Sequence, residues 1–119
     1  MARVETVPVG FALVEMLGPR VPHLEEVDVH PAHGRHGIGT ALVRMVCRWT
    51  ATMGYAGITL TTFRAVAWNM PFYARLGFVE VAAADLTPAV ATVVRDEAAR
   101  GLDPARRVVM RWRVSESGA

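Results

Sequence analysis

His23-Leu-Glu-Glu-Val-Asp-Val-His-Pro31-Ala-His-Gly-Arg-His36-Gly-Ile-Gly-Thr40 is the stretch that decides the fold of this chain. Its residue pattern predicts a β-strand up to Pro31, a polar loop up to His36 and a helix that starts at Gly37. A glycine turn between a strand and a helix directs several backbone N–H groups to one point, at the positive end of the helix dipole. The stretch therefore predicts an anion-binding site.

The spacing of the glycines indicates which kind of anion site this is. A Walker P-loop requires a lysine, and the chain contains none. The dinucleotide fingerprint needs a third small residue at position 42, where this chain has Leu42. The pattern that remains is Arg35-x-Gly37-x-Gly39-Thr40, which follows the strand residues Val27-x-Val29.

This pattern resembles the acetyl-CoA-binding motif R/Q-x-x-G-x-G/A of the GNAT N-acetyltransferases, with Gly34 at the R/Q position and an arginine one place later. Asn69-Met-Pro-Phe-Tyr73-Ala-Arg-Leu-Gly-Phe78 is similar to that family's second CoA-contacting segment. The resemblance implies that acetyl-CoA donates an acetyl group to an amine. The CoA-binding residues that it implies are Val27, Asp28, Val29, Arg35, His36, Gly37, Ile38, Gly39, Thr40, Asn69 and Phe72.

Acetyl transfer to an amine also needs a base for the ammonium and an acid for the departing thiolate. Tyr73 occupies the position of the family's general acid, five residues before Phe78. His23, Glu25 and Glu26 stand where these enzymes often place the base, and the sequence leaves the choice among them open. Asn69 either contacts the pantetheine arm or only caps its helix.

The strand that contains His23 needs an irregularity. Leu24 has one parity and Val27 and Val29 have the other, so strict alternation cannot bury all three. A β-bulge near Glu25-Glu26 corrects the register. The GNAT resemblance likewise implies a bulged strand that splays from its neighbour.

The remaining pattern predicts an α/β fold in the order ββαβαβαβ, within one domain of residues 1–119. Ile38, Leu42, Met45, Trp49 and Met53 recur at helical spacing and predict an amphipathic helix closed by Gly54. The other expected segments are strands at 7–17, 57–63, 78–82 and 107–113, a short helix capped by Asn69 and stopped by Gly77, and a helix from Thr87-Pro88 to about Arg100. Compared with the GNAT pattern, this is a mixed, partly splayed sheet with helices on both faces, lacking the first strand and the first two helices.

Composition narrows the class of protein further. The 119 residues have a net charge of +2, and the arginines are scattered, so no nucleic-acid partner is expected. No membrane span or signal peptide is visible, and the single Cys47 is expected to be a buried, inert thiol of a cytoplasmic protein. His30, His33 and His36 lie in a loop without cysteine, so no metal is expected.

Two questions remain open from the sequence. In the GNAT family the missing helices wall the acceptor site, so the alternative to an enzyme is a non-catalytic module that binds acyl-CoA or a partner. An uncovered sheet edge and the 52% hydrophobic content also predict a homodimer, or a longer natural chain.

Overall fold

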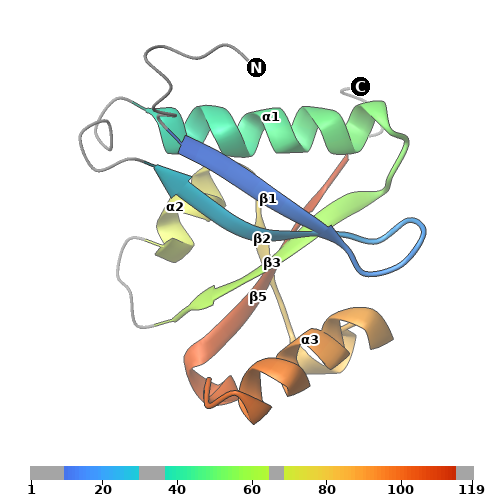
Figure 1. The fold of residues 1–119 in the computed structure, drawn as a ribbon, viewed down its shortest axis with the longest axis vertical. Helices are drawn as coiled ribbons and strands as arrows, with labels where there is room; N and C mark the ends of the chain where they lie inside the picture. The colour runs from blue at the N-terminus through green and yellow to red at the C-terminus, as the bar shows by residue number, and fades with distance from the viewer. Residues whose placement is uncertain (1–9, 30–36, 65–68, 115–119) are drawn as a thin grey trace.

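The computed structural model describes residues 10–29, 37–64 and 69–114, which form a five-stranded mixed sheet with helices on both faces (Figure 1). The strands lie in the order β1-β2-β3-β5-β4, and only the β2–β3 pair is parallel. The strands are β1 (Gly10–Met16), β2 (Pro22–Val29), β3 (Gly57–Phe63), β4 (Val79–Val81) and β5 (Arg107–Arg113). The helices are α1 (Ile38–Thr52), α2 (Asn69–Arg75) and α3 (Pro88–Ala99), with 3-10 turns at Ala83–Asp85 and Pro104–Arg106. The α/β class and the element order are as predicted.

The apolar core lies between the sheet and the helices α1 and α2. Alternate residues of the strands point into it, as the two-residue period of a strand requires. Its buried members are Leu24, Val43, Val46, Cys47, Ile58, Leu60, Phe78, Val108 and Met110. Helix α3 lies against the opposite face of the sheet, at the far side of the molecule from α1 (Figure 1).

The buried face of α1 differs from the expected one. Val43, Val46, Cys47 and Thr50 face the sheet, whereas Met45 and Trp49 are 49% and 37% exposed. Both sets recur at three- and four-residue intervals, so periodicity alone could not separate them. The set with smaller side chains lets α1 approach the sheet closely, and that set is the one buried.

Capping residues set most of the predicted boundaries. Thr87 accepts a hydrogen bond from the backbone N–H of Val90 at 3.4 Å and begins α3, as expected. Gly77 has a φ of 98°, which favours glycine, and it ends the turn after α2. The strand predicted over residues 78–82 is shorter, at Val79–Val81, and Phe78 before it is buried in the core. No helix within the described residues has the length and apolarity needed to span a membrane.

Candidate functional site

A β-bulge and the splaying of two strands define the centre of the candidate site. Leu13 pairs with Glu26 and Val14 with Leu24, so Glu25 is the extra residue of β2, where a bulge was predicted. The bulge lets Leu24 and Val27 both pack on the core. Strand β2 pairs with β3 only at His23 and Leu24, and no later residue of the described strand pairs with β3. The predicted splay is therefore present.

The glycine turn at the start of α1 lies beside this splay. Gly37 has a φ of 71°, and its carbonyl accepts a hydrogen bond from the Ala41 N–H at 3.0 Å. A Cβ placed on Gly39 would lie 3.7 Å from Phe72 Cζ and 3.8 Å from Val29 Cγ2. Three residues expected to bind CoA thus meet, although 43 positions separate the first from the last (72 − 29).

The other residues expected to bind CoA, apart from Asn69, fall into three groups. Ile38 and Thr40 lie in the first turn of α1, where backbone N–H groups have no partner within the helix. Val27 packs on the core and Asp28 is exposed. Arg35 and His36 lie outside the described residues, as do His30 and His33, so their expected roles stay predictions.

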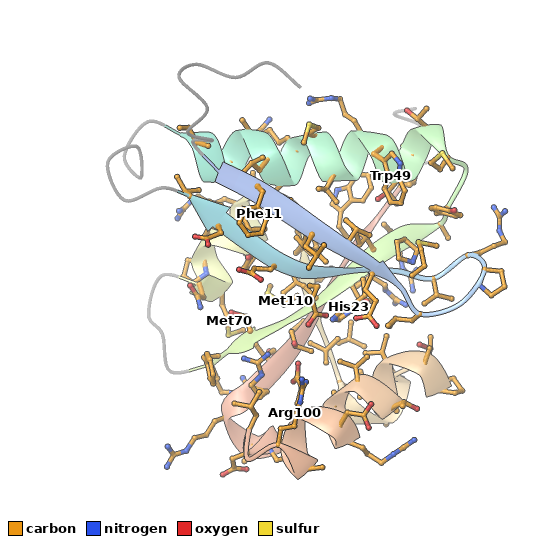
Figure 2. The ribbon with its side chains drawn as sticks, viewed as in Figure 1. Phe11, His23, Trp49, Met70, Arg100 and Met110 are labelled. Carbon is orange, nitrogen blue, oxygen red and sulfur yellow. The ribbon has the colours of Figure 1, made fainter. Side chains whose placement is uncertain are left out.

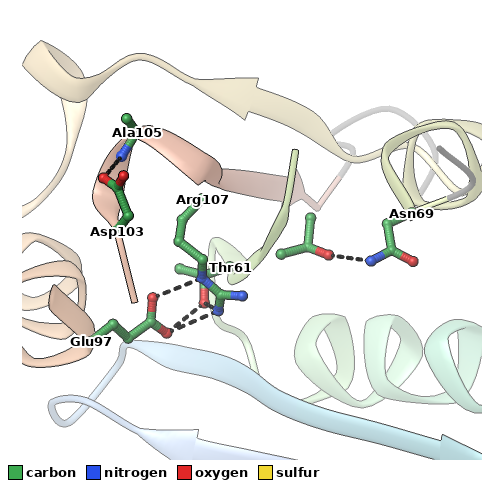
Figure 3. Close-up of polar contacts among 7 residues, drawn as sticks. Thr61, Asn69, Glu97, Asp103, Ala105 and Arg107 are labelled. Atoms are coloured by element: carbon green, nitrogen blue, oxygen red, sulfur yellow. Dashed lines mark hydrogen bonds and ion pairs between the residues drawn. The ribbon is translucent and has the colours of Figure 1, made fainter. Parts of the chain in front are cut away.

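Asn69 has a different contact from the expected cap. It is the first residue of α2, and its side-chain amide donates a hydrogen bond to Thr62 Oγ1 at 2.9 Å (Figure 3). This bond uses the NH2 group of the amide, whereas a helix cap would use its oxygen, so the cap stays a prediction. The bond instead ties α2 to β3 next to the splay.

Tyr73 is half-buried among aromatic side chains of the same region. Its ring centroid lies 5.1 Å from that of Phe72 and 5.6 Å from that of Phe78, both in edge-on geometry. Burial raises the pKa of its hydroxyl, so Tyr73 stays protonated at neutral pH. It can donate a proton but is a poor base.

The three candidate bases lie in very different surroundings. His23 is 1% exposed, its Nδ1 lies 2.8 Å from Thr59 Oγ1, and burial lowers its pKa, so the ring is neutral at pH 7. Partial burial, then the charge and hydrogen bond of Glu15 and the charge of Glu97, raise the pKa of Glu25. Glu26 is exposed. The charges of Glu15 and Glu97 affect the pKa values of both His23 and Glu25, and the prediction that His23 and Glu25 share one face stays a prediction.

A buried ion pair on the α3 face was not predicted. Arg107 Nε donates to Glu97 Oε1, and Arg107 Nη2 donates to Glu97 Oε2, both at 3.1 Å (Figure 3). Thr61 accepts from Arg107 and donates to Glu97, at 2.8 Å each. The Arg107 guanidinium also lies 4.4 Å from the centroid of Phe63. The cluster begins one residue after β2 leaves β3, and the alternation of arginines in β5 was its only signal in the sequence.

Cys47 is buried on the sheet-facing side of α1, as predicted. Burial raises the pKa of its thiol to about 11. The thiol therefore stays protonated at neutral pH and is a poor nucleophile.

The comparison with protein families agrees with this geometry. The model of the acetyltransferase (GNAT) family matches residues 1–78, which is about two thirds of the chain. The chain therefore belongs to the GNAT acetyltransferase family, as the glycine turn and the segment of residues 69–78 indicated.

Solved structures share the fold at low sequence identity. The ribosomal-protein-S18-alanine N-acetyltransferase from Escherichia coli is 19% identical with a TM-score of 0.65, and the match covers 90% of this chain and 62% of that one. Ard1 from Thermoplasma volcanium is 19% identical with a TM-score of 0.68, over 91% and 64%. A putative streptothricin acetyltransferase from Bacillus anthracis, in complex with acetyl coenzyme A, is 17% identical with a TM-score of 0.67, over 90% and 56%. This chain spans less than two thirds of each.

Proposed function

We propose that this protein is an N-acetyltransferase that moves acetyl from acetyl-CoA directly to a primary amine of a small molecule or a protein. The observation that carries the proposal is the meeting of Val29, Gly39 and Phe72 at the start of α1, beside the splay of β2 from β3. Membership of the GNAT family supports acetyl transfer in general. The acceptor amine is left open.

The residues at the start of α1 fit a CoA pyrophosphate. Gly39 lacks a Cβ where Phe72 and Val29 approach, and the first turn of a 15-residue helix presents N–H donors. When bound, acetyl-CoA would supply the activated acetyl group. We assign its contacts to Val27, Asp28 and Val29 of β2, to residues 35–40 and to Asn69 and Phe72.

We assign the proton transfers to residues of the two strands and of α2. Tyr73 would hold a proton for the thiolate, since burial keeps its hydroxyl protonated. Full transfer is uphill, because an ordinary tyrosine pKa of ~10 lies above a thiol pKa of ~8.5. The base that receives the ammonium proton is His23, Glu25 or Glu26. The neutral ring of His23 favours it, whereas its burial requires the amine or a water to reach it.

A non-catalytic module that binds acyl-CoA remains the competing proposal. A thiol-release assay with acetyl-CoA against a panel of amines, run beside calorimetry with CoA, separates the two. Turnover with at least one amine supports the enzyme, and CoA binding without turnover on any amine supports the module.

The glycine turn gives the sharpest binding test. A valine at position 39 would add two methyl groups where a Cβ alone already contacts Phe72 and Val29. Gly39→Val should therefore weaken CoA binding by about tenfold or more, roughly 1.4 kcal/mol or more. Gly18→Ala, in the turn between β1 and β2, is the control, because a Cβ there would meet no atom closer than 3.4 Å, and it should leave CoA affinity unchanged. Equal CoA affinity in wild type and Gly39→Val would overturn the assigned site.

Apolar side chains of β1 support the expected self-association. Phe11 and Leu13 are 46% and 50% exposed. Ala12 and Val14, which alternate with them along the strand, pack on the core, so Phe11 and Leu13 point to the opposite face. Figure 2 labels Phe11 on β1. Strand β1 is also an edge of the described sheet. A homodimer through this face, or cover by a further part of a longer chain, stays a prediction that light scattering tests.

A further inference from the structure

A hollow lies on the α3 face of the sheet, away from the glycine turn. It is about 560 Å³ in volume and is lined by the first residues of β2 and β3, the end of β5 and the start of α3. The glycine turn, in contrast, follows the last residues of β2. A hollow of this size suits a small molecule.

Three arginines from separate parts of the chain line this hollow. Arg111 and Arg113 come from β5, and Arg20 comes from the turn between β1 and β2. No acidic residue lines the hollow among the described residues. Arg20 is held in place, because its Nη2 donates to the Gly54 carbonyl at 2.6 Å and its guanidinium lies 5.5 Å from the centroid of Tyr55. The hollow is therefore positively charged on more than one side.

Arg107 has a carboxylate partner, whereas Arg111 in the hollow has none among the described residues. They are four positions apart in β5, so they point to the same face, and both are partly buried. Arg107 has a bidentate carboxylate partner in Glu97, whereas the described residues provide no carboxylate within 4.0 Å of Arg111 or Arg113. Glu80 and Asp85 line the neighbouring hollow on the other side of these two arginines, without forming an ion pair to them. A bound anion would give Arg111 the kind of partner that Glu97 gives Arg107.

The rest of the lining is apolar. Val21, Pro22, Val90 and Val114 contribute to it, and the positive end of α3 lies beside them at Thr87. An inorganic anion alone would leave these side chains facing water. An anion joined to an apolar body would contact both the guanidinium groups and the apolar wall.

We propose that this hollow binds a small organic anion, a carboxylate or phosphate attached to an apolar group, through Arg20, Arg111 and Arg113. This site is separate from the assigned CoA site, and the proposal does not depend on acetyl transfer.

NMR titration of the full chain with phenyl phosphate, benzoate and neutral benzyl alcohol tests the proposal. We expect phenyl phosphate or benzoate to shift the backbone signals of Thr59, Val90 and Arg111, and to leave those of Gly37 and Gly39 in place. Phenyl phosphate and benzoate distinguish a phosphate from a carboxylate ligand. Benzyl alcohol, which lacks the charge, should bind at least about tenfold more weakly.

Two variants and a matched control locate the binding. Arg111→Gln should weaken binding of the better anion by about tenfold. Arg113→Gln should also weaken it, and because Arg113 is more exposed, this variant replaces Arg111→Gln in the test if Arg111→Gln does not fold. Arg95→Gln is the control, because Arg95 is exposed on α3 and its guanidinium contacts Thr92. Absence of binding by both anions, equal binding of benzyl alcohol, or equal effects of the Arg111 and Arg95 variants would overturn the proposal.

Discussion

The two faces of the same sheet have opposite chemistry. On the α1 side, β3 and β5 present Ile58, Leu60, Val108 and Met110, all buried and apolar. On the α3 side the alternate residues of these strands include Thr59, Thr61, Arg107 and Arg111, and the adjoining residue of β2 is His23. Since neighbours along a strand point to opposite faces, one strand serves both purposes. The α1 face holds the fold together, and the α3 face places ionisable groups around the splay.

Truncating a buried side chain of the apolar face should have the largest effect on stability. Leu60 is 2% exposed at the centre of the core, so Leu60→Ala should remove about 3 kcal/mol from the free energy of unfolding through lost burial and the cavity left behind. Urea unfolding monitored by circular dichroism measures it. Val79→Ala is the control, because Val79 is 65% exposed and its truncation should cost well under ~1 kcal/mol. Equal losses for the two variants would contradict the assigned core.

Tyr73 tests whether chemistry also depends on a side chain of the apolar face. Tyr73→Phe keeps the ring between Phe72 and Phe78 and removes only the hydroxyl. If that hydroxyl protonates the thiolate, kcat should fall ~10²-fold, about 2.7 kcal/mol, with CoA affinity nearly unchanged. Steady-state kinetics on the best amine, with calorimetry for CoA, measure both quantities. An unchanged kcat would leave Tyr73 with a packing role alone.

The difference between the faces also explains what the sequence could predict. The apolar face follows from local rules: the β-branched run in β3, Gly77 after α2, and the parity conflict that predicted a bulge near Glu25-Glu26. The buried side of α1 did not follow, because Val43 and Met45 both belong to apolar sets with helical spacing and only packing on the sheet selects one.

The polar face could be predicted only in part. His23 and Glu25 lie within one short segment, so strand parity alone could predict that they share a face, before the bulge at Glu25 is considered. Glu97 and Arg107 belong to different elements, and no local pattern states that a helix residue will meet a strand residue across the sheet. The arginine-lined hollow could not be predicted for the same reason, since only the tertiary structure brings Arg20 and Arg111 to one hollow.

Removing one partner of the buried ion pair should test the polar face. Glu97→Ala leaves the Arg107 guanidinium and the Thr61 hydroxyl without their carboxylate. We expect a loss of about 2 kcal/mol, less than for a fully buried pair, because the Arg107 side chain keeps 12% exposure and the face of Phe63. Asp103→Ala is the comparison variant, because it removes an exposed ion pair with Arg106 at 4.0 Å. It also removes the acceptor of a hydrogen bond from the Ala105 N–H. Thermal unfolding should rank Glu97→Ala as the more damaging, and the reverse order would refute a stabilising role for the pair.

The smallest effect concerns the pH dependence of stability through His23. Burial lowers the pKa of this ring in the folded protein, Glu97 and Glu15 partly oppose that shift and Arg107 adds to it. As pH falls below the unfolded value of ~6.5, the unfolded chain binds the proton first, so stability decreases on acidification. Its contribution is complete above that pH, and the slope cannot exceed ~1.4 kcal/mol per pH unit.

The comparison of wild type with His23→Gln isolates this contribution. The variant also loses the ring's bond to Thr59, which shifts the whole curve by a constant amount and does not change its slope. The other three histidines and Glu25, whose pKa is raised, titrate in both proteins, and their contributions largely cancel in the difference. Unfolding free energies of wild type and His23→Gln, from urea titrations between pH 5 and 8, should therefore run parallel above about pH 7 and converge below it. The reason is that only in the wild type does the unfolded chain gain a proton at His23 before the folded protein does. Curves that stay parallel down to pH 5 would show that His23 titrates normally, and the argument that its neutral ring favours it over Glu25 and Glu26 as the base would have to be abandoned.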